Sequence, residues 1–155
     1  MVNTIDGSSP MPASAADLWA VLALLDAAGL PTADVGLHFG DFFVIRDAHR
    51  LIGAVGVETY GDSALLRSLV VQPEWRGRGL GRRLLEYALT ASRNRNVRTV
   101  YLLTTSAEGF FAPLGFERCD RATVPHAIAR TSEFASLCPA SAVCMRQQLV
   151  PSSCG

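Results

Sequence analysis

Hydrophobic residues near the start of the chain recur at helical intervals. Between Ser14 and Gly29 the apolar side chains fall three and four positions apart, and Gly29 followed by Pro31 ends the pattern as a helix C-terminus does. Prolines and small polar residues at 7–14 separate this helix from any earlier element. The pattern predicts a short strand at Val2–Asp6, a helix over 14–28 and a short helix or turn over 31–39.

Three β-rich runs follow. Short segments at 47–50 and 61–63 separate them and contain turn-forming residues such as Gly61 and Asp62. Consecutive strands joined by such short turns pair antiparallel. We therefore expect an antiparallel meander of three strands at Phe42–Arg46, Leu51–Tyr60 and Ala64–Val71.

After Pro73 the hydrophobic pattern changes from the period of a strand to that of a helix. Leu80, Leu84 and Leu85 fall on one helical face, and Arg82 falls on the other. Antiparallel strands followed by strands that alternate with helices predict an α/β fold with a mixed sheet. The later elements are expected to be a strand at Val97–Leu103, a short helix at Ala107–Pro113, a strand at Phe116–Asp120, a helical or irregular segment at Pro125–Ser136 and a closing strand at Ala142–Leu149.

Composition indicates a globular domain with a small-molecule partner. Of the 155 residues, 49% are hydrophobic and 18% are charged, which is typical of a buried core and not of a disordered chain. The 14 basic and 14 acidic residues balance, so charge favours neither nucleic acid nor an anionic membrane as a partner. The length suits a single domain over 1–150 and a short loose tail over 151–155.

Two further patterns are missing from the sequence. It has no bilayer-spanning apolar run and no signal-peptide pattern, so we expect a cytoplasmic location. The cysteines form no C-x-x-C pair, and no histidine lies at metal-ligand spacing, so we expect free thiols and no bound metal. The cysteines are Cys119, Cys138, Cys144 and Cys154.

A glycine-rich segment joins the third strand of the meander to the helix after it. Glycines let a ligand approach the backbone, and the N–H groups of a helix's first turn attract anions, so the segment predicts phosphate binding. A plain turn is the alternative. Arg82 and Arg83 stand where a Walker loop needs Lys and Ser or Thr, and the G-x-G-x-G spacing differs from a dinucleotide fingerprint. The segment is Arg76-Gly77-Arg78-Gly79-Leu80-Gly81.

Two motifs resemble those of the GNAT superfamily of N-acetyltransferases and occur in that family's order within residues 42–120. The resemblance implies a central mixed, mostly antiparallel sheet of six to seven strands, splayed between the fourth and fifth and flanked by about four helices. The motifs are Leu69-Val70-Val71-Gln72-Pro73-Glu74-Trp75-Arg76-Gly77-Arg78-Gly79-Leu80-Gly81 and Ala107-Glu108-Gly109-Phe110-Phe111-Ala112-Pro113-Leu114-Gly115-Phe116.

The resemblance implies acetyl-coenzyme A as the cosubstrate. Main-chain groups at the end of the third run would pair with its pantetheine arm, and N–H groups of the glycine-rich segment would hold its pyrophosphate. The side chains of Arg76 and Arg78 would add charge, with an ordinary solvated loop surface as the alternative. The implied cofactor-binding residues are Leu69, Val70, Val71, Arg76, Gly77, Arg78, Gly79, Leu80, Gly81, Arg82, Thr104, Phe110 and Phe111.

The resemblance also assigns catalytic roles, with one departure from the family pattern. The N–H of Val70 would stabilise the oxyanion of the reaction. The family's proton donor is a tyrosine, but Phe111 stands at that position and has no proton to give. A non-catalytic acetyl-coenzyme A sensor is therefore an alternative to an enzyme. In an enzyme, the proton would come from water or from Ser68, Thr104, Thr105 or Ser106.

Glu58 is the predicted general base. It lies late in a β-rich run, where strand alternation places it on one face with Tyr60. Glu108, which opens the predicted short helix, is the second carboxylate considered. An ordinary exposed strand residue is the alternative for Glu58.

Arg67 interrupts an otherwise apolar run, and a buried guanidinium needs an anionic partner. A substrate carboxylate or oxyanion would serve, so the predicted substrate-binding residues are Arg67, Glu58, Ser68 and Thr105. The alternative is an internal salt bridge with Glu58 or Asp62.

Three segments resemble, more narrowly, a GNAT subfamily of arsenic-resistance N-acetyltransferases. The resemblance implies a small acceptor, an arsenic-containing amino acid related to glutamate. Another small amine or amino-acid metabolite is the alternative acceptor, and pairing among GNAT relatives makes a homodimer one form of assembly. For Cys138 a packing role is favoured over arsenic–thiol chemistry. The segments are 65–68, 104–111 and 133–145.

Overall fold

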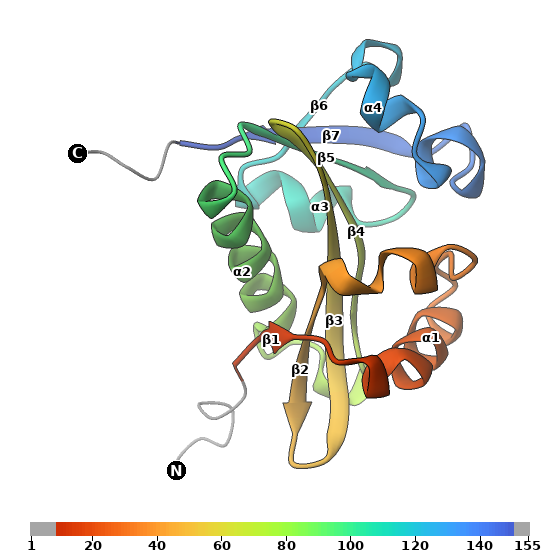
Figure 1. Cartoon of the computed structure of the whole chain (residues 1–155), viewed down its shortest axis with the longest axis vertical. Helices are drawn as coiled ribbons and strands as arrows, with labels where there is room; N and C mark the ends of the chain where they lie inside the picture. The colour runs from red at the N-terminus through yellow and green to blue at the C-terminus, as the bar shows by residue number, and fades with distance from the viewer. Residues whose placement is uncertain (1–8, 151–155) are drawn as a thin grey trace. The chain divides into compact units, whose positions relative to one another are not determined.

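The computed structural model describes residues 9–150, in which seven strands pair in the order β1-β2-β3-β4-β5-β7-β6 (Figure 1). The sheet is mostly antiparallel, with β4 and β5 parallel, which confirms the predicted mixed α/β fold. The strand expected at Val2–Asp6 and the tail expected at 151–155 lie outside the described residues. The strands are β1 Met11–Pro12, β2 Phe42–Asp47, β3 Arg50–Tyr60, β4 Ser63–Val71, β5 Thr99–Thr104, β6 Glu117–Arg118 and β7 Val143–Gln148.

Four α-helices accompany these strands in the described part of the chain, as expected from the resemblance. They are α1 Leu18–Ala27, α2 Leu80–Asn94, α3 Glu108–Phe111 and α4 His126–Ala129. Short 3-10 turns lie at Ala15–Asp17, Val35–Asp41, Pro73–Trp75, Ala112–Leu114 and Arg121–Thr123, and a π-helix lies at Glu133–Leu137. Within residues 9–150 no helix is long and apolar enough to cross a membrane.

Contacts divide the chain into two compact units. The first holds the described residues up to Val57 together with Ser68–Ala88, and the second holds Glu58–Arg67 together with the described residues from Leu89 onward. Strands β3 and β4 and helix α2 therefore contribute to both units.

In the first unit the two faces of the sheet pack on different helices (Figure 1). Leu25 of α1 shares a buried cluster with Val44 of β2 and Ala54 of β3. On the other face, a Cβ atom added at Gly53 would lie 2.9 Å from Leu84 Cδ1, so α2 approaches β3 closely there. Successive strand residues point to opposite faces, which explains why β2 and β3 are apolar almost throughout.

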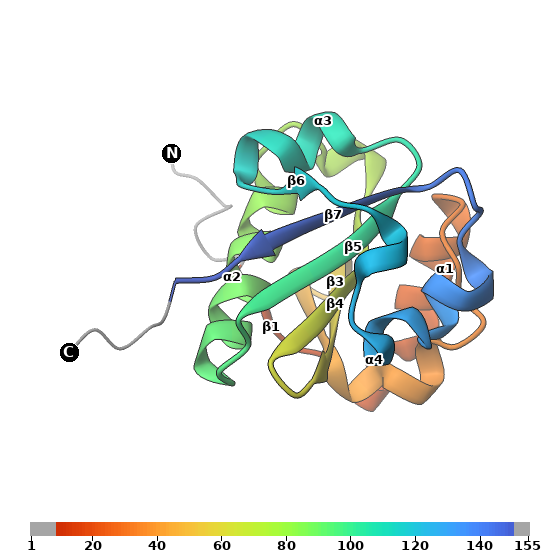
Figure 2. The same cartoon turned by 90° about the horizontal axis from the view of Figure 1, so that it is seen from above.

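In the second unit β5 and β7 pair antiparallel over six residues each (Figure 2). The expected strand at Phe116–Asp120 is shorter in the structure, where β6 has two residues. Gly115 precedes it in the left-handed region with φ of 102°, and Asp120 follows as the N-cap of a 3-10 turn, accepting a hydrogen bond from Ala122 N. These two local conformations limit the strand at both ends.

The start of the first helix rests on a buried carboxylate. Asp17 accepts hydrogen bonds from the Ser14 backbone N–H (2.8 Å) and from the Arg46 guanidinium. Burial alone would raise the pKa of Asp17, but the hydrogen bonds from Arg46 and Ser14 and the charge of Arg46 hold it below its usual value. A carboxylate with a lowered pKa stabilises the fold above its unfolded pKa, and this stabilisation disappears as the pH falls through the folded value.

We therefore expect Asp17→Asn to lower the free energy of unfolding by about 1 kcal/mol at pH 7. The difference from the wild type should begin to shrink near pH ~4, where Asp17 of the unfolded state takes up its proton, and should disappear only below the lowered pKa of the folded state. Urea unfolding at a series of pH values measures both effects. A difference that does not change with pH would show that Asp17 acts only through its shape.

Candidate active site

The glycine-rich segment forms the N-terminus of α2, in the first unit. Gly79 O accepts the first bond of the helix, from Arg83 N at 3.1 Å, so Gly79 is the N-cap and the N–H groups of the next three residues have no intrahelical acceptor. Gly77 and Gly79 have φ of 80° and 81°, a region that L-residues avoid. The structure thus places residues 77–82 together around a helix end suited to an anion.

The arginines of this segment each have a partner on the surface. Arg76 Nε donates to Val71 O at 3.2 Å, which holds the segment against the end of β4. The Arg78 guanidinium stacks on Trp75, 4.6 Å from the ring centroid, and Arg82 Nε bonds Glu86 Oε2 at 3.0 Å. Each of these arginine side chains therefore has a surface contact, and the backbone N–H groups at the helix end are the candidate anion donors that the fold itself positions.

Strand β4 is distorted just before the cofactor motif. Ser68 has φ of +60° inside the strand and is buried. Such a backbone conformation interrupts regular pairing and re-aims the residues that follow. Leu69, Val70 and Val71 directly follow this position, and the oxyanion role of the Val70 N–H stays a prediction.

Ser68→Gly and Ser68→Val should differ in stability. Glycine adopts positive φ without strain, whereas a β-branched residue is an outlier there. We expect Ser68→Val to lower the free energy of unfolding by about 1–3 kcal/mol and Ser68→Gly to cost far less. Chemical denaturation of the three proteins tests this, and equal losses would indicate that the hydroxyl contacts of Ser68 matter more than its backbone.

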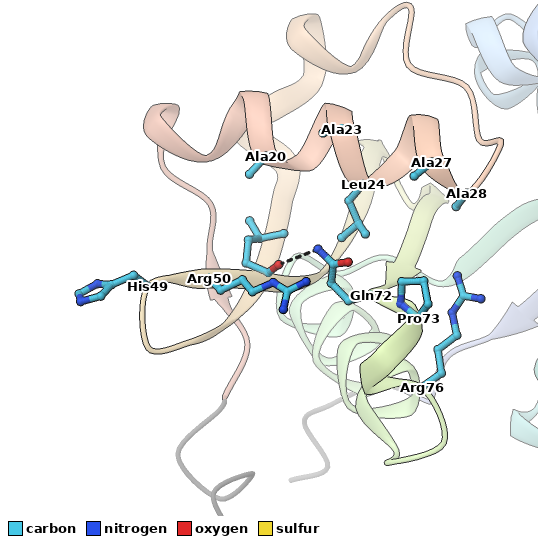
Figure 3. Close-up of a pocket in the computed structure, with 11 residues that line it drawn as sticks. Ala20, Ala23, Leu24, Ala27, Ala28, His49, Arg50, Gln72, Pro73 and Arg76 are labelled. Carbon is cyan, nitrogen blue, oxygen red and sulfur yellow. Dashed lines mark hydrogen bonds between the residues drawn. The ribbon is translucent and has the colours of Figure 1, made fainter.

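A pocket of about 430 Å³ lies in the first unit between α1 and the ends of β3 and β4 (Figure 3). One wall is the alanine-rich side of α1, and the floor includes Leu24 and Leu51. Gln72 Nε2 donates to Leu51 O at 3.4 Å, and Arg76 stands at the rim. The pocket thus adjoins the first residue of the glycine-rich segment.

The second unit contains three buried charges. Arg67 Nη1 lies 2.8 Å from Glu58 Oε2, and Arg67 Nη2 lies 3.4 Å from Glu133 Oε2. The side chain of Arg67 is 0% exposed, and those of Glu58 and Glu133 are 3% and 5% exposed. Two carboxylates therefore surround one guanidinium away from water.

This cluster bears on two predictions. The internal salt bridge that the sequence left open for Arg67 is present, with Glu58 as expected and with Glu133 as a second partner. Glu58 is buried, so it is not an ordinary exposed strand residue. Because Arg67 is already compensated, it needs no substrate anion, and its role in substrate binding stays a prediction.

Glu58 is held through both of its oxygens. Tyr60 Oη donates to Oε1 at 2.5 Å, and Arg67 donates to Oε2. Glu58 and Tyr60 lie on one face of β3, as strand alternation predicts. The role of Glu58 as general base stays a prediction.

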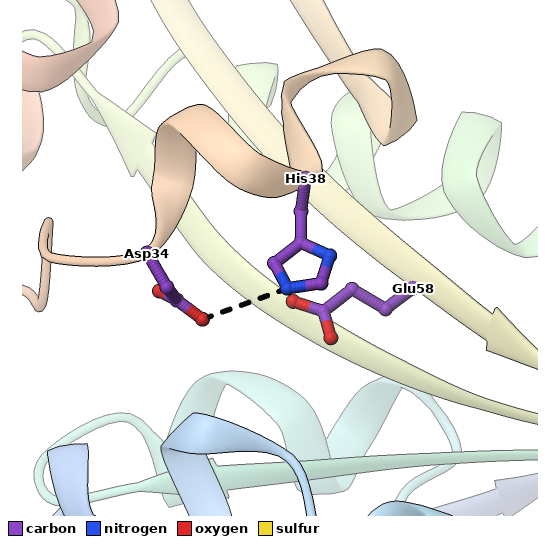
Figure 4. Close-up of side chains that lie close together, drawn as sticks. All are labelled: Asp34, His38 and Glu58. Carbon is purple, nitrogen blue, oxygen red and sulfur yellow. Dashed lines mark ion pairs between the residues drawn. The ribbon is translucent and has the colours of Figure 1, made fainter.

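An acidic side chain and a histidine pair on the 3-10 turn of the first unit. His38 Nε2 lies 3.9 Å from Asp34 Oδ2, as the dashed line in Figure 4 marks. Asp34 is buried and His38 is half-buried. The hydrophobic pattern at 31–39 is weak, so the sequence gives no signal that these two side chains meet.

The second motif forms α3 and its flanking turns in the second unit. Thr104 Oγ1 accepts a hydrogen bond from Ala107 N at 2.9 Å, so it shapes the turn before α3. Phe111 is buried and its ring packs edge-on against those of Phe110 and Phe116, at 5.0 Å and 5.5 Å. Thr105 and Ser106 are exposed.

Glu108 is poorly suited to act as a base. Arg118 donates to both of its oxygens, one bond measuring 2.7 Å. The hydrogen bond from Arg118 lowers the pKa of Glu108. Of the two carboxylates considered from sequence, Glu58 is therefore the better candidate.

The described cysteines are free thiols, as expected. Burial, and next the nearby charge of Glu133, raise the pKa of Cys138 to about 12. Burial and the hydrogen bond with Cys119 raise the pKa of Cys144 to about 12, with the two sulfurs 3.1 Å apart. Cys138 therefore stays protonated at neutral pH, which agrees with a packing role and opposes a thiolate one.

Comparison with known proteins identifies the family. The model of the acetyltransferase (GNAT) domain matches residues 38–118, about half of the chain. The chain belongs to the GNAT acetyltransferase family. This GNAT domain is also 34% identical over 94 residues to the uncharacterized N-acetyltransferase CT2212 of Chlorobaculum tepidum, covering 60% of each chain.

Solved structures share its fold. N-acetylglutamate synthase from Neisseria gonorrhoeae, complexed with coenzyme A and N-acetyl-glutamate, superposes with a TM-score of 0.80 at 20% identity, over 92% of this GNAT domain and 35% of that chain. Rv2747 from Mycobacterium tuberculosis, in complex with CoA, gives 0.78 at 20% identity, over 91% and 99%. The matches to CT2212 and to the synthase thus span less than two thirds of those proteins, and identities near 20% establish the fold alone.

Proposed function

We propose that this GNAT domain transfers the acetyl group of acetyl-coenzyme A to the amino group of a small, amino-acid-like acceptor. The observation that carries the proposal is the helix end at residues 77–82, directly after a strand distorted at Ser68. A helix N-terminus with glycines at positive φ binds phosphate, and the distorted strand supplies main-chain groups beside it. The pyrophosphate of acetyl-coenzyme A would bind at the helix N-terminus, and its amide-rich arm would pair with the main chain of the distorted strand.

The cofactor's arm would pair with the main chain of Leu69, Val70 and Val71. The parallel pairing of β4 with β5 includes Ser63–Leu65 and Thr99–Tyr101, at the other end of β4 from these three residues. They follow the positive φ of Ser68, a backbone conformation that departs from a regular strand. Arg76, Arg78 and Arg82 would contribute charge around the phosphates.

The reaction forms an N–C bond and breaks the thioester C–S bond, and the amine loses one proton while the thiolate gains one. The Val70 N–H would stabilise the developing oxyanion. Glu58 would accept the amine's proton. With Phe111 buried among aromatic rings, the thiolate's proton would come from water or from Ser68, Thr104, Thr105 or Ser106.

For the acceptor, we propose an amino acid of the glutamate type, including an arsenic-containing analogue. Two of the segments that resemble the arsenic-resistance subfamily, 65–68 and 133–145, contribute Arg67 and Glu133 to one buried cluster. This supports a shared role for the two segments. An acceptor anion would reach Arg67 only by displacing a carboxylate, so recognition of the acceptor through its amino group fits the charges better. A cytoplasmic location, a homodimer and the absence of a metal stay predictions.

Release of free thiol from acetyl-coenzyme A tests the proposal. The panel contains L-glutamate, arsinothricin, phosphinothricin and simple primary amines. We expect release with at least one glutamate-type acceptor and none with its N-acetylated form. Release only with simple amines would exclude the glutamate-type acceptor, and tight cofactor binding without release across the panel would favour the sensor.

A further inference from the structure

Glu133 joins the closing part of the chain to the buried guanidinium of β4. It begins a π-helix, is 4% exposed and lies 3.4 Å from Arg67 Nη2. A buried charge is costly without a partner, so this ion pair fixes the carboxylate and the guanidinium relative to each other. π-helices are rare and frequently occur at functional sites.

The segment around Glu133 is itself held in place. Arg121 donates to Phe134 O and Pro139 O, both at 2.8 Å, and its guanidinium lies 5.6 Å from the Phe134 ring centroid. Cys138 N donates to Glu133 O at 3.0 Å, and Cys138 Sγ lies 3.7 Å from Glu133 Oε1. Both oxygens of Glu133 therefore have a described contact, and its carboxylate has a defined position.

A continuous chain of contacts runs from this segment to the candidate base. Glu133 contacts one nitrogen of Arg67, a second nitrogen of Arg67 contacts Glu58, and Tyr60 contacts the other oxygen of Glu58. Each of these residues belongs to the second unit. A shift of the guanidinium would consequently move or release the Glu58 carboxylate.

We propose that Glu133 is a positioning residue of the acceptor site. By holding Arg67 it fixes Glu58 in the geometry needed to take a proton from the acceptor amine, and it couples the 133–138 segment to that geometry. The inference rests on the proposed function, because it assumes that the acceptor amine is deprotonated at Glu58. In this role Glu133 acts through Arg67 and need not touch the acceptor.

The negative charge of Glu133, and not only its shape, matters for this role. Two carboxylates share one guanidinium, so each limits the pull of Arg67 on the other. In Glu133→Gln the side chain keeps its size and an acceptor oxygen but loses its charge. Arg67 then loses the charge of one of its two described carboxylate partners, and we expect the geometry at Glu58 to change.

Glu133→Gln tests the proposal, with Glu117→Gln as the matched control. Glu117 is exposed and pairs with Arg146 at 3.1 Å, so the same chemical change there leaves the buried cluster intact. We expect Glu133→Gln to lower kcat/KM for the acceptor about tenfold or more, the size expected for a small misplacement of a catalytic group. The Kd for acetyl-coenzyme A should stay within about twofold of the wild type, because Glu133 is not among the residues proposed to bind the cofactor. Glu133→Asp keeps the charge and should restore part of the loss.

Two results would contradict the positioning role of Glu133. Equal acceptor kinetics in Glu133→Gln and wild type, or a parallel loss of acceptor turnover and cofactor affinity, would overturn the positioning role. If Glu133→Gln does not fold, Glu133→Asp and Cys138→Ala are compared in its place by the same criteria. If the wild type itself turns over no acceptor, the proposed function fails first. Hydrogen exchange at 131–138 then tests the inference separately, since unchanged exchange in Glu133→Gln would refute the coupling.

Discussion

Replacing Arg67 with methionine is expected to lower the free energy of unfolding by about 3–5 kcal/mol at pH 7. The side chain is 0% exposed and compensates Glu58 and Glu133 at once. Methionine fills a similar volume, so the loss comes from removing the guanidinium that pairs with two buried carboxylates. Urea unfolding monitored by far-UV circular dichroism measures it.

Two further variants identify the cause. Arg82→Met removes a guanidinium of the exposed Arg82–Glu86 pair and should change stability by less than about 0.5 kcal/mol. Adding Glu58→Gln and Glu133→Gln to Arg67→Met removes all three charges and should recover most of the loss. If the triple variant is as unstable as Arg67→Met, lost packing, and not charge, explains the effect.

The glycine-rich segment could be predicted from sequence because its signals are local. Glycine positions, the preceding strand and the helical period all fall within residues 69–89, and the structure shows the helix beginning at Leu80 as expected. The requirement for positive φ follows from residue type alone at Gly77 and Gly79. Ser68 could not be identified this way, since serine carries no signal for φ of +60°.

The buried cluster could be predicted only in part. An arginine in an apolar run requires an anion, and Glu58, nine residues earlier, was a natural candidate. Asp62 was a candidate for the same reason, but it is exposed, and its carbonyl accepts hydrogen bonds from Arg98 N and Thr99 N. Glu133 lies in a segment whose pattern gave no clear element, so its approach to Arg67 depends on tertiary packing that local signals do not encode.

The contact between Cys119 and Cys144 also could not be predicted from local sequence signals. The residues are opposite each other because Arg118 pairs with Met145, and Cys119 N donates to Cys144 O at 2.9 Å. Strand register of this kind depends on the neighbouring turn and core, and spacing along the chain does not reveal it.

Gly79→Val is expected to weaken acetyl-coenzyme A binding by at least 100-fold. No protein atom lies within 4 Å of a Cβ placed at Gly79, so packing does not exclude a side chain there. The φ of 81° at Gly79 disfavours valine, which is an outlier in that region of backbone conformation. The helix end would have to rearrange to accept it. The added branched side chain would also stand where the phosphates approach the backbone N–H groups.

Gly61→Val separates these effects from general strain. Gly61 also has positive φ, 63°, and open space around its Cβ position, but it lies in the turn between β3 and β4. Both variants should lose stability, by about 1–3 kcal/mol for a strained backbone, while only Gly79→Val should lose the cofactor in isothermal titration. Gly79→Asn is informative as well, because asparagine tolerates positive φ and caps helices. Weak cofactor binding in Gly79→Asn would identify the side chain as the obstacle, and wild-type affinity in Gly79→Val would mean that the phosphates bind elsewhere.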